Sequence, residues 1–479
     1  MSDSTQPCSE DPLVVEKVHN EDRVWGWLIP LADGLKSVAL KNQAICAGRD
    51  SDVCSVVFES ITFDGKGCDI GVEKVSRIHF QINFDPIQEK TTLEDLSMNG
   101  TWVNGIRVGK KNMIVMEHCS AISILSKTVL VFSYLDIIAI EKSFPRSLTT
   151  NYLVGRKLGE GTTSIVHLGY RRIDSSEVAL KIIKTTSWPS KYSQPVDMMS
   201  EVNVLAGLEH PCITKVEEVI EDNTSMTIVM EFARGGELFD RVVDDYRKNK
   251  LTERMAKLRF YQVVEAVRYL HSNNVCHRDL KLENLLLADD GPCPLIKVSD
   301  FGLSKCWEGD ILHSYVGTPV YMAPEVLVLG TSDSDNEEVN SSYTSKADCW
   351  SLGVILYLLL SCKHPFNKGD NLSQNILTGR FNSMKGIMWE NISSTAKSLV
   401  RALLEVNPSK RLSAEQILQH RWFTQDIETV LAARKIIWKV EARDDTSKRD
   451  SGINLSTVRS KRPRKEIPLI DLTEDTSEE

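Results

Sequence analysis

A glycine-rich turn, followed by a lysine in an apolar strand, is the first feature of this sequence that could carry chemistry. The turn reads LGEGTTSIV from Leu158 to Val166, and its glycines would let backbone amides approach phosphate oxygens. Such a turn is weak evidence alone, and Ser164 stands at the place of a third glycine. Lys181 in VALK would lie on the next apolar strand, where its buried charge requires phosphates and an acid as partners. Glu201, on the helix expected next, is the candidate acid.

Three more motifs follow in the order HRDLKLEN, DFG and APE. Asp279 lies in the first motif, Asp300 opens the second and Glu325 closes the third. The whole set, in this order and at this spacing, resembles the eukaryotic protein-kinase family over residues 152–423. The resemblance implies an ATP:protein phosphotransferase that uses ATP and Mg²⁺. A non-catalytic pseudokinase scaffold is the alternative, but no residue that catalysis requires is missing.

The kinase resemblance implies a role for each matching position. Asp279 would orient the substrate hydroxyl and accept its proton, and Lys281 would steady the transferring phosphoryl group. Asn284 and Asp300 would hold the magnesium ions. The other ATP-binding positions that the resemblance implies are Leu158, Gly159, Gly161, Val166, Ala179, Lys181 paired with Glu201, the gatekeeper Met230, the hinge residues Glu231 to Ala233, and Glu237.

Residues around the catalytic motifs indicate support and regulation. By the same resemblance, Asp348 would support the catalytic loop and Glu325 would pair with Arg411. Arg278, next to the catalytic aspartate, is a cation that a phosphate on the activation loop could neutralise and order. The best candidates for that phosphorylation are Ser314 and Thr318.

Details of the motifs narrow the substrate class. The pattern Lys281-x-Glu283-Asn284 and the run GTP at 317–319 are typical of serine/threonine kinases. The run GGELF at 235–239 resembles the calmodulin-dependent-kinase group, in which the acid at the position of Glu237 can meet a substrate arginine. With Glu283 nearby, two carboxylates would favour protein substrates with Arg three residues before the target hydroxyl. In the alternative reading, Glu237 contacts only the ribose.

A second set of motifs precedes the kinase-like region. Gly48-Arg49, SRIH at 76–79, NGT at 99–101 and VNG at 103–105 stand on loops between short strand-like runs. Individually each is unremarkable, because such runs are common in turns. Together they resemble the forkhead-associated (FHA) family over most of residues 23–140. The resemblance implies a module that binds proteins containing phosphothreonine.

The side chains of this second set suit phosphate binding. Arg49, Ser76 and Arg77 could converge on phosphate oxygens with charge-assisted hydrogen bonds. Asn99 would bond the backbone of the bound peptide and position the residues that follow the phosphothreonine. His79 is expected to brace a loop rather than bind a metal.

The strand and helix patterns around these motifs predict a multidomain protein. Short strands with turn signals predict an all-β FHA sandwich over residues 23–140. Strands and then helical periods predict an α+β bilobal protein-kinase fold over 152–423. The remaining expectations are a disordered head at 1–22, a linker at 141–151, an acidic insertion at 330–342, and a tail at 424–479 that begins with an amphipathic helix near 426–440.

Composition limits the class further. The 479 residues carry a formal net charge of −9, which argues against a chain that binds nucleic acid through its overall field. Eleven cysteines form no CxxC pair, and no signal peptide precedes them, which favours reduced thiols in the cytosol or nucleus. No apolar stretch reaches the roughly 20 residues that cross a bilayer, so we expect no membrane partner.

An FHA module directly before a kinase of this group resembles the checkpoint kinase 2 family, the DNA-damage effector kinases. The resemblance implies activation by large phosphatidylinositol-3-kinase-like kinases, which favour Ser or Thr followed by Gln. Thr5-Gln6 fits, although the head holds one such site rather than a cluster. Phosphorylated Thr5 would dock in the FHA module of another chain, so that a transient homodimer phosphorylates itself in trans. The alternatives are a relative specialised for meiotic breaks and a phosphothreonine-binding scaffold.

The tail carries signals for location and partners. KR at 448–449 and RSKRPRK at 459–465 resemble a bipartite nuclear-import signal, with a solvated charge run as the alternative. PLIDLTED at 468–475 resembles a SUMO-interacting motif, with a plain acidic terminus as the alternative. DSG at 450–452 with Ser456 resembles a phosphodegron, although the spacing is imperfect.

Overall fold

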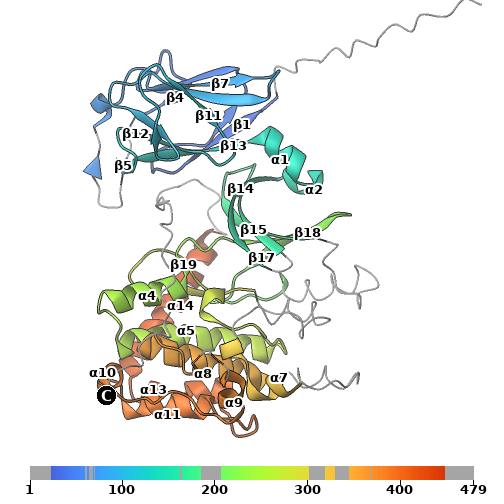
Figure 1. Cartoon of the computed structure of the whole chain (residues 1–479), viewed down its shortest axis with the longest axis vertical. Coiled ribbons are helices and arrows are strands. Elements are labelled where there is room, and N and C mark those ends of the chain that lie inside the picture. Colours follow the sequence, from blue (N-terminus) through green and yellow to red (C-terminus); the bar gives the residue numbers. More distant parts are fainter. Residues whose placement is uncertain are drawn as a thin grey trace, which may run out of the picture. The chain divides into compact units, whose positions relative to one another are not determined.

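The structure is a computed structural model with two compact units, which divide between Thr149 and Thr150 (Figure 1). It describes residues 23–59, 62–63, 68–69, 71–161, 164–184, 206–300, 319–329, 345–367, 369 and 371–447. The head at 1–22, the acidic insertion at 330–342 and the tail motifs after residue 447 lie outside these residues.

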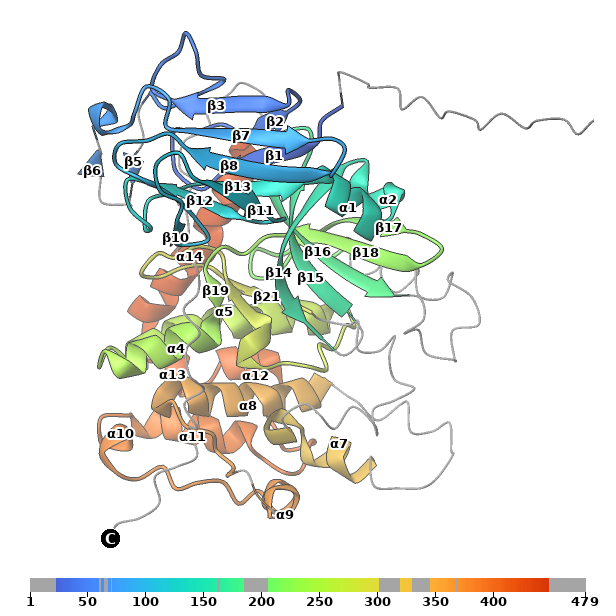
Figure 2. The same cartoon turned by 45° about the horizontal axis from the view of Figure 1, so that its top comes forward.

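The first unit is a sandwich of two sheets, which confirms the predicted all-β FHA fold. One sheet has the order β10-β9-β12-β13-β1-β2 and the other has the order β11-β8-β7-β3-β4, with β3 and β4 parallel. Figure 2 shows β3, β7 and β8 side by side. The strands are β1 (Gly26–Pro30), β2 (Val38–Leu40), β3 (Ala44–Gly48), β4 (Val56–Val57), β5 (Thr62–Phe63), β6 (Cys68–Asp69), β7 (Phe80–Asp85), β8 (Lys90–Asp95), β9 (Thr101–Val103), β10 (Ile106–Arg107), β11 (Met113–Met116), β12 (Ala121–Ile124) and β13 (Leu130–Asp136).

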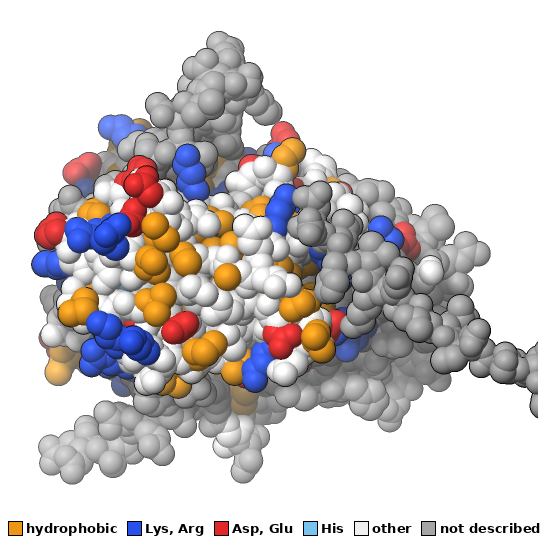
Figure 3. Space-filling view, turned by 90° about the horizontal axis from the view of Figure 1, so that it is seen from above, with side chains coloured by type: hydrophobic (Ala, Val, Ile, Leu, Met, Phe, Trp, Pro, Cys, Tyr) orange, Lys and Arg blue, Asp and Glu red, His pale blue; other side chains and the backbone are white. Residues whose placement is uncertain are grey.

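Alternating side chains explain why these segments pair as a sandwich. In β7, Phe80 and Ile82 are buried, whereas Gln81 and Asn83 face outward. Phe58 joins the two sheets, because its ring centroid lies 6.3 Å from Phe80 on one sheet and 6.3 Å from Phe132 on the other. Seen from above, this unit presents scattered hydrophobic side chains among uncharged ones, with Lys and Arg gathered toward the rim (Figure 3).

Two short helices follow the last strand of the sandwich. They are α1 (Ile137–Ser143) and α2 (Arg146–Thr149), so the segment 141–151, expected as a linker, is largely helical. The Asp136 carboxylate caps α1 by accepting a hydrogen bond of 3.0 Å from the amide of Ala139. Ile138 packs against the core cluster of the first unit, which anchors the helix there.

The second unit begins with a five-stranded antiparallel sheet in the order β14-β15-β16-β18-β17 (Figure 2). Its strands are β14 (Tyr152–Glu160), β15 (Ser164–Arg171), β16 (Glu177–Lys184), β17 (Val216–Glu221) and β18 (Ser225–Glu231). Most of the helix expected to carry Glu201 lies outside the described residues. A second, three-stranded sheet is formed by β19 (Gly236–Glu237), β20 (Leu285–Leu287) and β21 (Ile296–Val298).

The rest of the second unit is helical, which confirms the predicted bilobal order of strands and then helices. Helix α8 lies at its centre, and fifteen of its residues, from Ala347 to Ser361, are buried. None of the described helices is both long and apolar enough to cross a membrane. The helices are α4 (Leu238–Arg247), α5 (Glu253–Ser272), α7 (Pro324–Leu329), α8 (Ser345–Ser361), α9 (Leu372–Leu377), α10 (Ile387–Glu390), α11 (Ser394–Leu403), α12 (Ala414–Leu418), α13 (Arg421–Thr424) and α14 (Ile427–Ser447).

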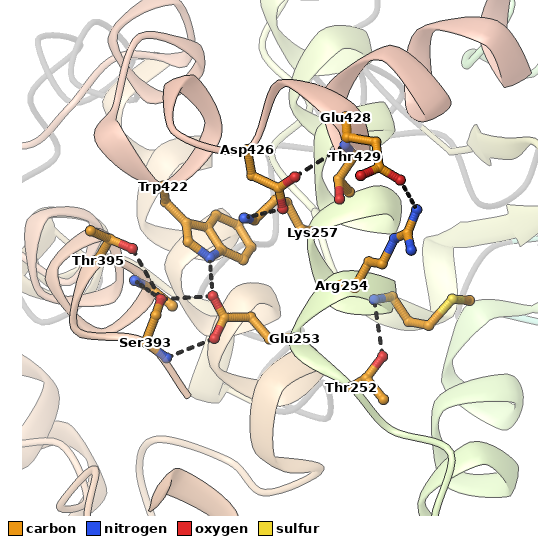
Figure 4. Close-up of polar contacts among 12 residues, drawn as sticks. Thr252, Glu253, Arg254, Lys257, Ser393, Thr395, Trp422, Asp426, Glu428 and Thr429 are labelled. Atoms are coloured by element: carbon orange, nitrogen blue, oxygen red, sulfur yellow. Dashed lines mark hydrogen bonds and ion pairs between the residues drawn. The ribbon is translucent and has the colours of Figure 1, made fainter. Parts of the chain in front are cut away.

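Helix α14 includes the amphipathic helix expected near 426–440, and it packs against α5. Ala433 and Ile437 are buried in the core cluster of the second unit. At the start of α14, Asp426 receives a hydrogen bond of 2.7 Å from Lys257 on α5 (Figure 4). Glu253, also on α5, accepts a hydrogen bond of 2.7 Å from the indole of Trp422 (Figure 4). The first part of the expected tail is therefore part of the folded second unit.

We predict that Asp426→Asn lowers the free energy of unfolding by about 2 kcal/mol, because the Lys257 charge loses its carboxylate partner. The Lys257 side chain is only 8% exposed, so water replaces the carboxylate poorly. Asparagine can still cap α14, which isolates the effect of the charge. The matched control is Glu428→Gln, whose partner Arg254 is 62% exposed and should change stability little. Equal denaturant midpoints for the two variants would contradict this account.

Candidate active site and phosphate-binding loops

The catalytic loop rests on the buried carboxylate of Asp348, in the first turn of α8. Its Oδ2 accepts a hydrogen bond of 2.9 Å from the amide of His277, and its Oδ1 accepts one of 3.0 Å from the amide of Arg278. His271 Nε2 on α5 lies 2.8 Å from Oδ2. Burial alone would raise the pKa of Asp348, but the hydrogen bond and charge of His271 hold it below its usual value. Asp348 thus supports the loop as the sequence predicts.

His277 connects the catalytic loop to the segment that carries Asp300. Its Nδ1 accepts a hydrogen bond of 3.3 Å from the amide of Asp279, so the ring proton lies on Nε2 and is donated to the carbonyl of Ser299 at 3.0 Å. Burial lowers the pKa of His277, which keeps the ring neutral and in this arrangement. His277 therefore supports both the catalytic loop and the residue just before the DFG motif.

The three residues predicted to act in catalysis, Asp279, Lys281 and Asn284, contact one another at the Asp279 side chain. Lys281 Nζ lies 2.7 Å from Asp279 Oδ2, and Asn284 Nδ2 donates to the carbonyl and to Oδ2 of Asp279 at 2.7 and 3.0 Å. The Asp279 side chain is 50% exposed, so a substrate can reach it. Among the described residues, these side-chain contacts engage Oδ2 and not Oδ1.

Lys181 lies across from this group on strand β16 of the small lobe. Its Nζ contacts Asp300 Oδ1 at 2.5 Å. Burial alone would raise the pKa of Asp300, but the charge of Lys181 holds that pKa below its usual value. The predicted partner Glu201 lies outside the described residues.

Strand register brings the other predicted nucleotide-binding positions together. Leu158 and Gly159 lie on β14, and Gly159 pairs with Val166 on β15. Val166 pairs in turn with Lys181. In the turn, the amide of Gly161 donates to the carbonyl of Ser164 at 2.8 Å, which closes the loop without a third glycine.

The hinge side of the predicted nucleotide site follows from the next strand pairing. Ala179 on β16 lies opposite Met230 on β18, and Met230 and Ala233 are both buried. Glu231 ends β18, and Glu237 directly precedes α4. The Glu231 carboxylate contacts Lys297 Nζ at 2.7 Å, a pairing that the sequence motifs do not indicate.

The residues proposed for metal binding offer oxygen ligands, which suit a hard cation such as Mg²⁺. Asn284 uses its amide hydrogens on Asp279, so its side-chain oxygen is the atom that can serve a cation. Asp300 supplies a carboxylate that the low pKa keeps ionised. Among the described residues, no group of three or more His, Cys, Asp or Glu could hold a metal ion by itself.

Below the site, Glu325 pairs with Arg411 as the sequence predicts. The two carboxylate oxygens accept from Arg411 at 2.6 and 2.9 Å. Arg411 also donates to three backbone carbonyls, and its guanidinium lies 5.2 Å from the ring centre of Trp350. The fully buried guanidinium is thus satisfied on all sides, as a buried charge requires.

In the first unit, the loops that carry Arg49 and Ser76 lie against each other. The amide of Arg49 donates to the carbonyl of Ser76 at 3.1 Å. Gly48 permits this approach, because a Cβ atom there would lie 2.0 Å from the carbonyl oxygen of Arg77. Packing therefore requires glycine at position 48.

His79 braces the second and third loops, as the sequence predicts. The amide of Ser76 donates to His79 Nδ1 at 3.2 Å, so Nε2 carries the proton and donates to the carbonyl of Gly100 at 3.1 Å. Burial lowers the pKa of His79, which favours the neutral ring. Ser76 Oγ accepts from the amide of Met98 at 3.0 Å, which joins the same loops near the predicted phosphate site.

Asn99 and Arg77 have partners within the unit. Asn99 Nδ2 donates to the carbonyl of Lys74 at 2.7 Å. Arg77 forms an ion pair with Asp50 at 2.5 Å, and its side chain is 76% exposed. Arg77 therefore lies beside the loops but points at a carboxylate.

Sequence reasoning missed two acids that shape these loops. One is Asp50, which holds Arg77. The other is Asp95 at the end of β8, which is buried and accepts four hydrogen bonds from Ser97 and Thr101. The local pattern DxS…T, typical of a side-chain-bonded turn, was the available signal for Asp95. Three predicted phosphosites, Thr5, Ser314 and Thr318, lie outside the described residues.

Comparison with known proteins identifies both units. Residues 152–423 match the protein kinase domain family, and residues 45–125 match the FHA domain family. The ovarian-specific serine/threonine-protein kinase Lok of Drosophila melanogaster is 34% identical over 375 residues, which cover 76% of each chain. The serine/threonine-protein kinase chk-2 of Caenorhabditis elegans is 32% identical over 429 residues, which cover 88% of this chain and 87% of that one.

One solved structure is also similar. The crystal structure of Rad53 1-466 in complex with AMP-PNP is 24% identical and covers 84% of this chain and 100% of its own, with a TM-score of 0.48. From the family matches and the two relatives, the chain belongs to the protein kinase family, as an FHA-containing serine/threonine kinase of the checkpoint kinase 2 type.

We predict that Asp348→Asn lowers kcat for peptide phosphorylation by about 100-fold. The asparagine side chain would place an NH2 donor where the His271 ring and two backbone amides also donate, so the catalytic loop would shift. The KM for ATP should stay within about three-fold, since Asp348 does not line the nucleotide site. Steady-state kinetics, with circular dichroism to verify folding, measure both. A kcat within two-fold of the unchanged protein would show that the loop holds its position without this carboxylate.

Proposed function

We propose that this kinase is guided to its partners by phosphothreonine and acts in the DNA-damage checkpoint and cell-cycle arrest. The observation that supports it best is the pairing of two sets of residues in one chain. One is the group around Asp279 and Asp300, and the other is the set of loops that holds Arg49, Ser76 and Asn99. The first suits phosphoryl transfer and the second suits recognition of a phosphate already in place.

The phosphoryl-transfer step assigns a task to each residue of the active site. The substrate hydroxyl loses its proton to Asp279 Oδ1 as its oxygen bonds to the γ-phosphorus of ATP, and ADP leaves. Lys281, held 2.7 Å from Asp279, steadies the transferring group, and Lys181 aligns the nucleotide. Asn284 and Asp300 would hold Mg²⁺, which supplies positive charge to the phosphates. Glu201 would take the place of Asp300 as the partner of Lys181.

In the FHA unit, phosphothreonine would bind where the three loops meet. Arg49 and the hydroxyl of Ser76 would contact the phosphate, and Asn99 would bond the peptide backbone. Arg77 would contribute its charge after exchanging the Asp50 carboxylate for a phosphate oxygen, or would act from a distance while paired. A doubly charged phosphate competes well with one carboxylate for a guanidinium.

Activation would follow from docking between chains. An upstream phosphatidylinositol-3-kinase-like kinase phosphorylates Thr5, and the FHA unit of a second chain binds it, giving a transient homodimer. The raised effective concentration then lets each kinase domain phosphorylate Ser314 and Thr318 of the other. A phosphate on either residue would neutralise and order Arg278, the cation next to the catalytic aspartate.

Substrate and location complete the proposal. Glu237 and Glu283 would select protein substrates with Arg three residues before the target hydroxyl. The basic run at 459–465 would direct the chain to the nucleus, and residues 468–475 could bind SUMO. No direct binding of nucleic acid or membrane is expected. A germ-line role in meiotic breaks is the second candidate, and the name of the ovarian-specific relative Lok favours it. Expression confined to the germ line would distinguish that role.

Binding of a peptide of residues 1–12 with phosphorylated Thr5 tests whether the FHA unit binds phosphothreonine. We predict that Arg49→Ala weakens binding about 10- to 100-fold, because a charged hydrogen bond to phosphate is lost. Arg23→Ala is the matched control, since Arg23 is an exposed arginine of the same unit that pairs with Glu141. Fluorescence polarisation on the full chain measures both. If the chain bound other phosphothreonine peptides but not this one, docking between two copies of the chain would be ruled out. Phosphothreonine binding by the FHA unit would still stand.

In cells with double-strand breaks, we predict a rise of phosphorylation at Thr5, followed by Ser314 and Thr318. Mass-spectrometric occupancy over time measures the order. Arg49→Ala should leave Thr5 phosphorylation intact and reduce the other two sites, because docking is lost but the upstream kinase is not. An active kinase with unchanged Thr5 occupancy would assign the protein to another pathway. Rescue of a null by Asp300→Ala but not by Arg49→Ala would favour the scaffold alternative.

A further inference from the structure

The hinge between the two lobes is tied to the large lobe by an ion pair. Glu231, the last residue of β18, accepts a contact of 2.7 Å from Lys297 Nζ on β21. The same carboxylate oxygen accepts a hydrogen bond of 2.9 Å from the amide of Lys215. β18 belongs to the small-lobe sheet and β21 to the sheet with β19 and β20, so the pair joins the lobes.

Lys297 is held in a place where its charge needs this partner. Its side chain is only 10% exposed, and that of Glu231 is 29% exposed. A mostly buried ammonium without a carboxylate is strongly disfavoured, so the lysine pulls the hinge carboxylate toward β21. Because of this contact, the Glu231 side chain is committed to β21.

β21 is fixed in turn by its own neighbours. Its Val298 exchanges backbone hydrogen bonds with the segment before β17: Thr214 N donates to Val298 O at 2.9 Å, and Val298 N donates to Cys212 O at 2.8 Å. Further along the hinge, the amide of Gly235 donates to the carbonyl of Leu287 on β20 at 2.7 Å. The hinge is thus attached to the β20–β21 hairpin at both ends.

The same strand leads directly to the metal-binding side of the site. Asp300 lies three residues after Lys297, and the intervening Ser299 is bonded to Asn284. One end of this short path faces the adenine-binding hinge and the other carries the carboxylate that contacts Lys181. A nucleotide must fit both ends at once.

We propose that Lys297 and Glu231 are a positioning pair for ATP, which sets the hinge relative to the strand that carries Asp300. This inference rests on the proposed nucleotide site between the hinge and Asp300. Without the pair, adenine and phosphates no longer fit their two subsites together. Contacts made equally in the ground and transition states are lost, which raises KM and changes kcat little.

Kinetics of Lys297→Met and Glu231→Gln on the full chain test the proposal. Each variant should raise the KM for ATP about 5- to 20-fold, while kcat and the KM for a peptide substrate stay within about three-fold. Lys297→Arg keeps the charge and should restore most of the ATP affinity. The double variant should be no worse than either single variant, because both remove the same interaction.

Lys257→Met is the matched control. Lys257 is also a mostly buried lysine, 8% exposed and 2.7 Å from a carboxylate, but it joins α5 to Asp426 away from the hinge. It should lower the melting temperature without changing the KM for ATP. If Lys297→Met only lowers the melting temperature in the same way, or if the two hinge variants have additive effects, the pair is structural and the proposal is wrong. If the rate of the protein without substitutions showed no saturable dependence on ATP, the proposed nucleotide site itself would be wrong.

Discussion

The buried carboxylate of Asp348 is the interaction on which the catalytic half of the molecule depends. A charge without water must be satisfied by donors, and here they come from separate parts of the chain: the His271 ring on α5 and two amides of the catalytic loop. The loop, α5 and α8 therefore cannot shift independently. His277 extends the constraint to the carbonyl of Ser299, so that Asp279 and Asp300 share a support. The reactive groups can then remain exposed and polar, because their positions are set by contacts below them.

The FHA unit applies the same logic to loops at the end of a sandwich. Its exposed Arg49 and half-buried Ser76 are positioned by backbone hydrogen bonds and by the buried His79 and Asp95. The residues proposed to bind phosphate contribute little to the core, which Phe58, Phe80 and similar side chains fill. Polar groups beneath the surface therefore determine the shape of these loops.

Residues expected to have a chemical task lie in motifs that the sequence shows directly, whereas most of the contacts that support them could not be predicted. The motifs around Asp279 and Asp300 are local and ordered, so spacing alone was informative. The partners Asp50 and Lys297 were missed, because they meet Arg77 and Glu231 only after strands far apart in sequence come together. The helices at 137–149 were missed since they are too short for a clear period. Helix α14 extends beyond the predicted range, and its outward Ile427, Leu431 and Trp438 blur the amphipathic pattern.

The packing of α14 has a consequence for where the kinase unit ends. The family match stops at residue 423, before Asp426 and the buried Ala433 and Ile437. A fragment that ended there would expose an apolar strip of α5 and leave the charge of Lys257 facing it. Because of this exposed apolar surface, such a fragment would be prone to self-association at the concentrations used for crystallisation. The folded kinase unit therefore extends beyond the family match, at least to the buried Ile437 of α14.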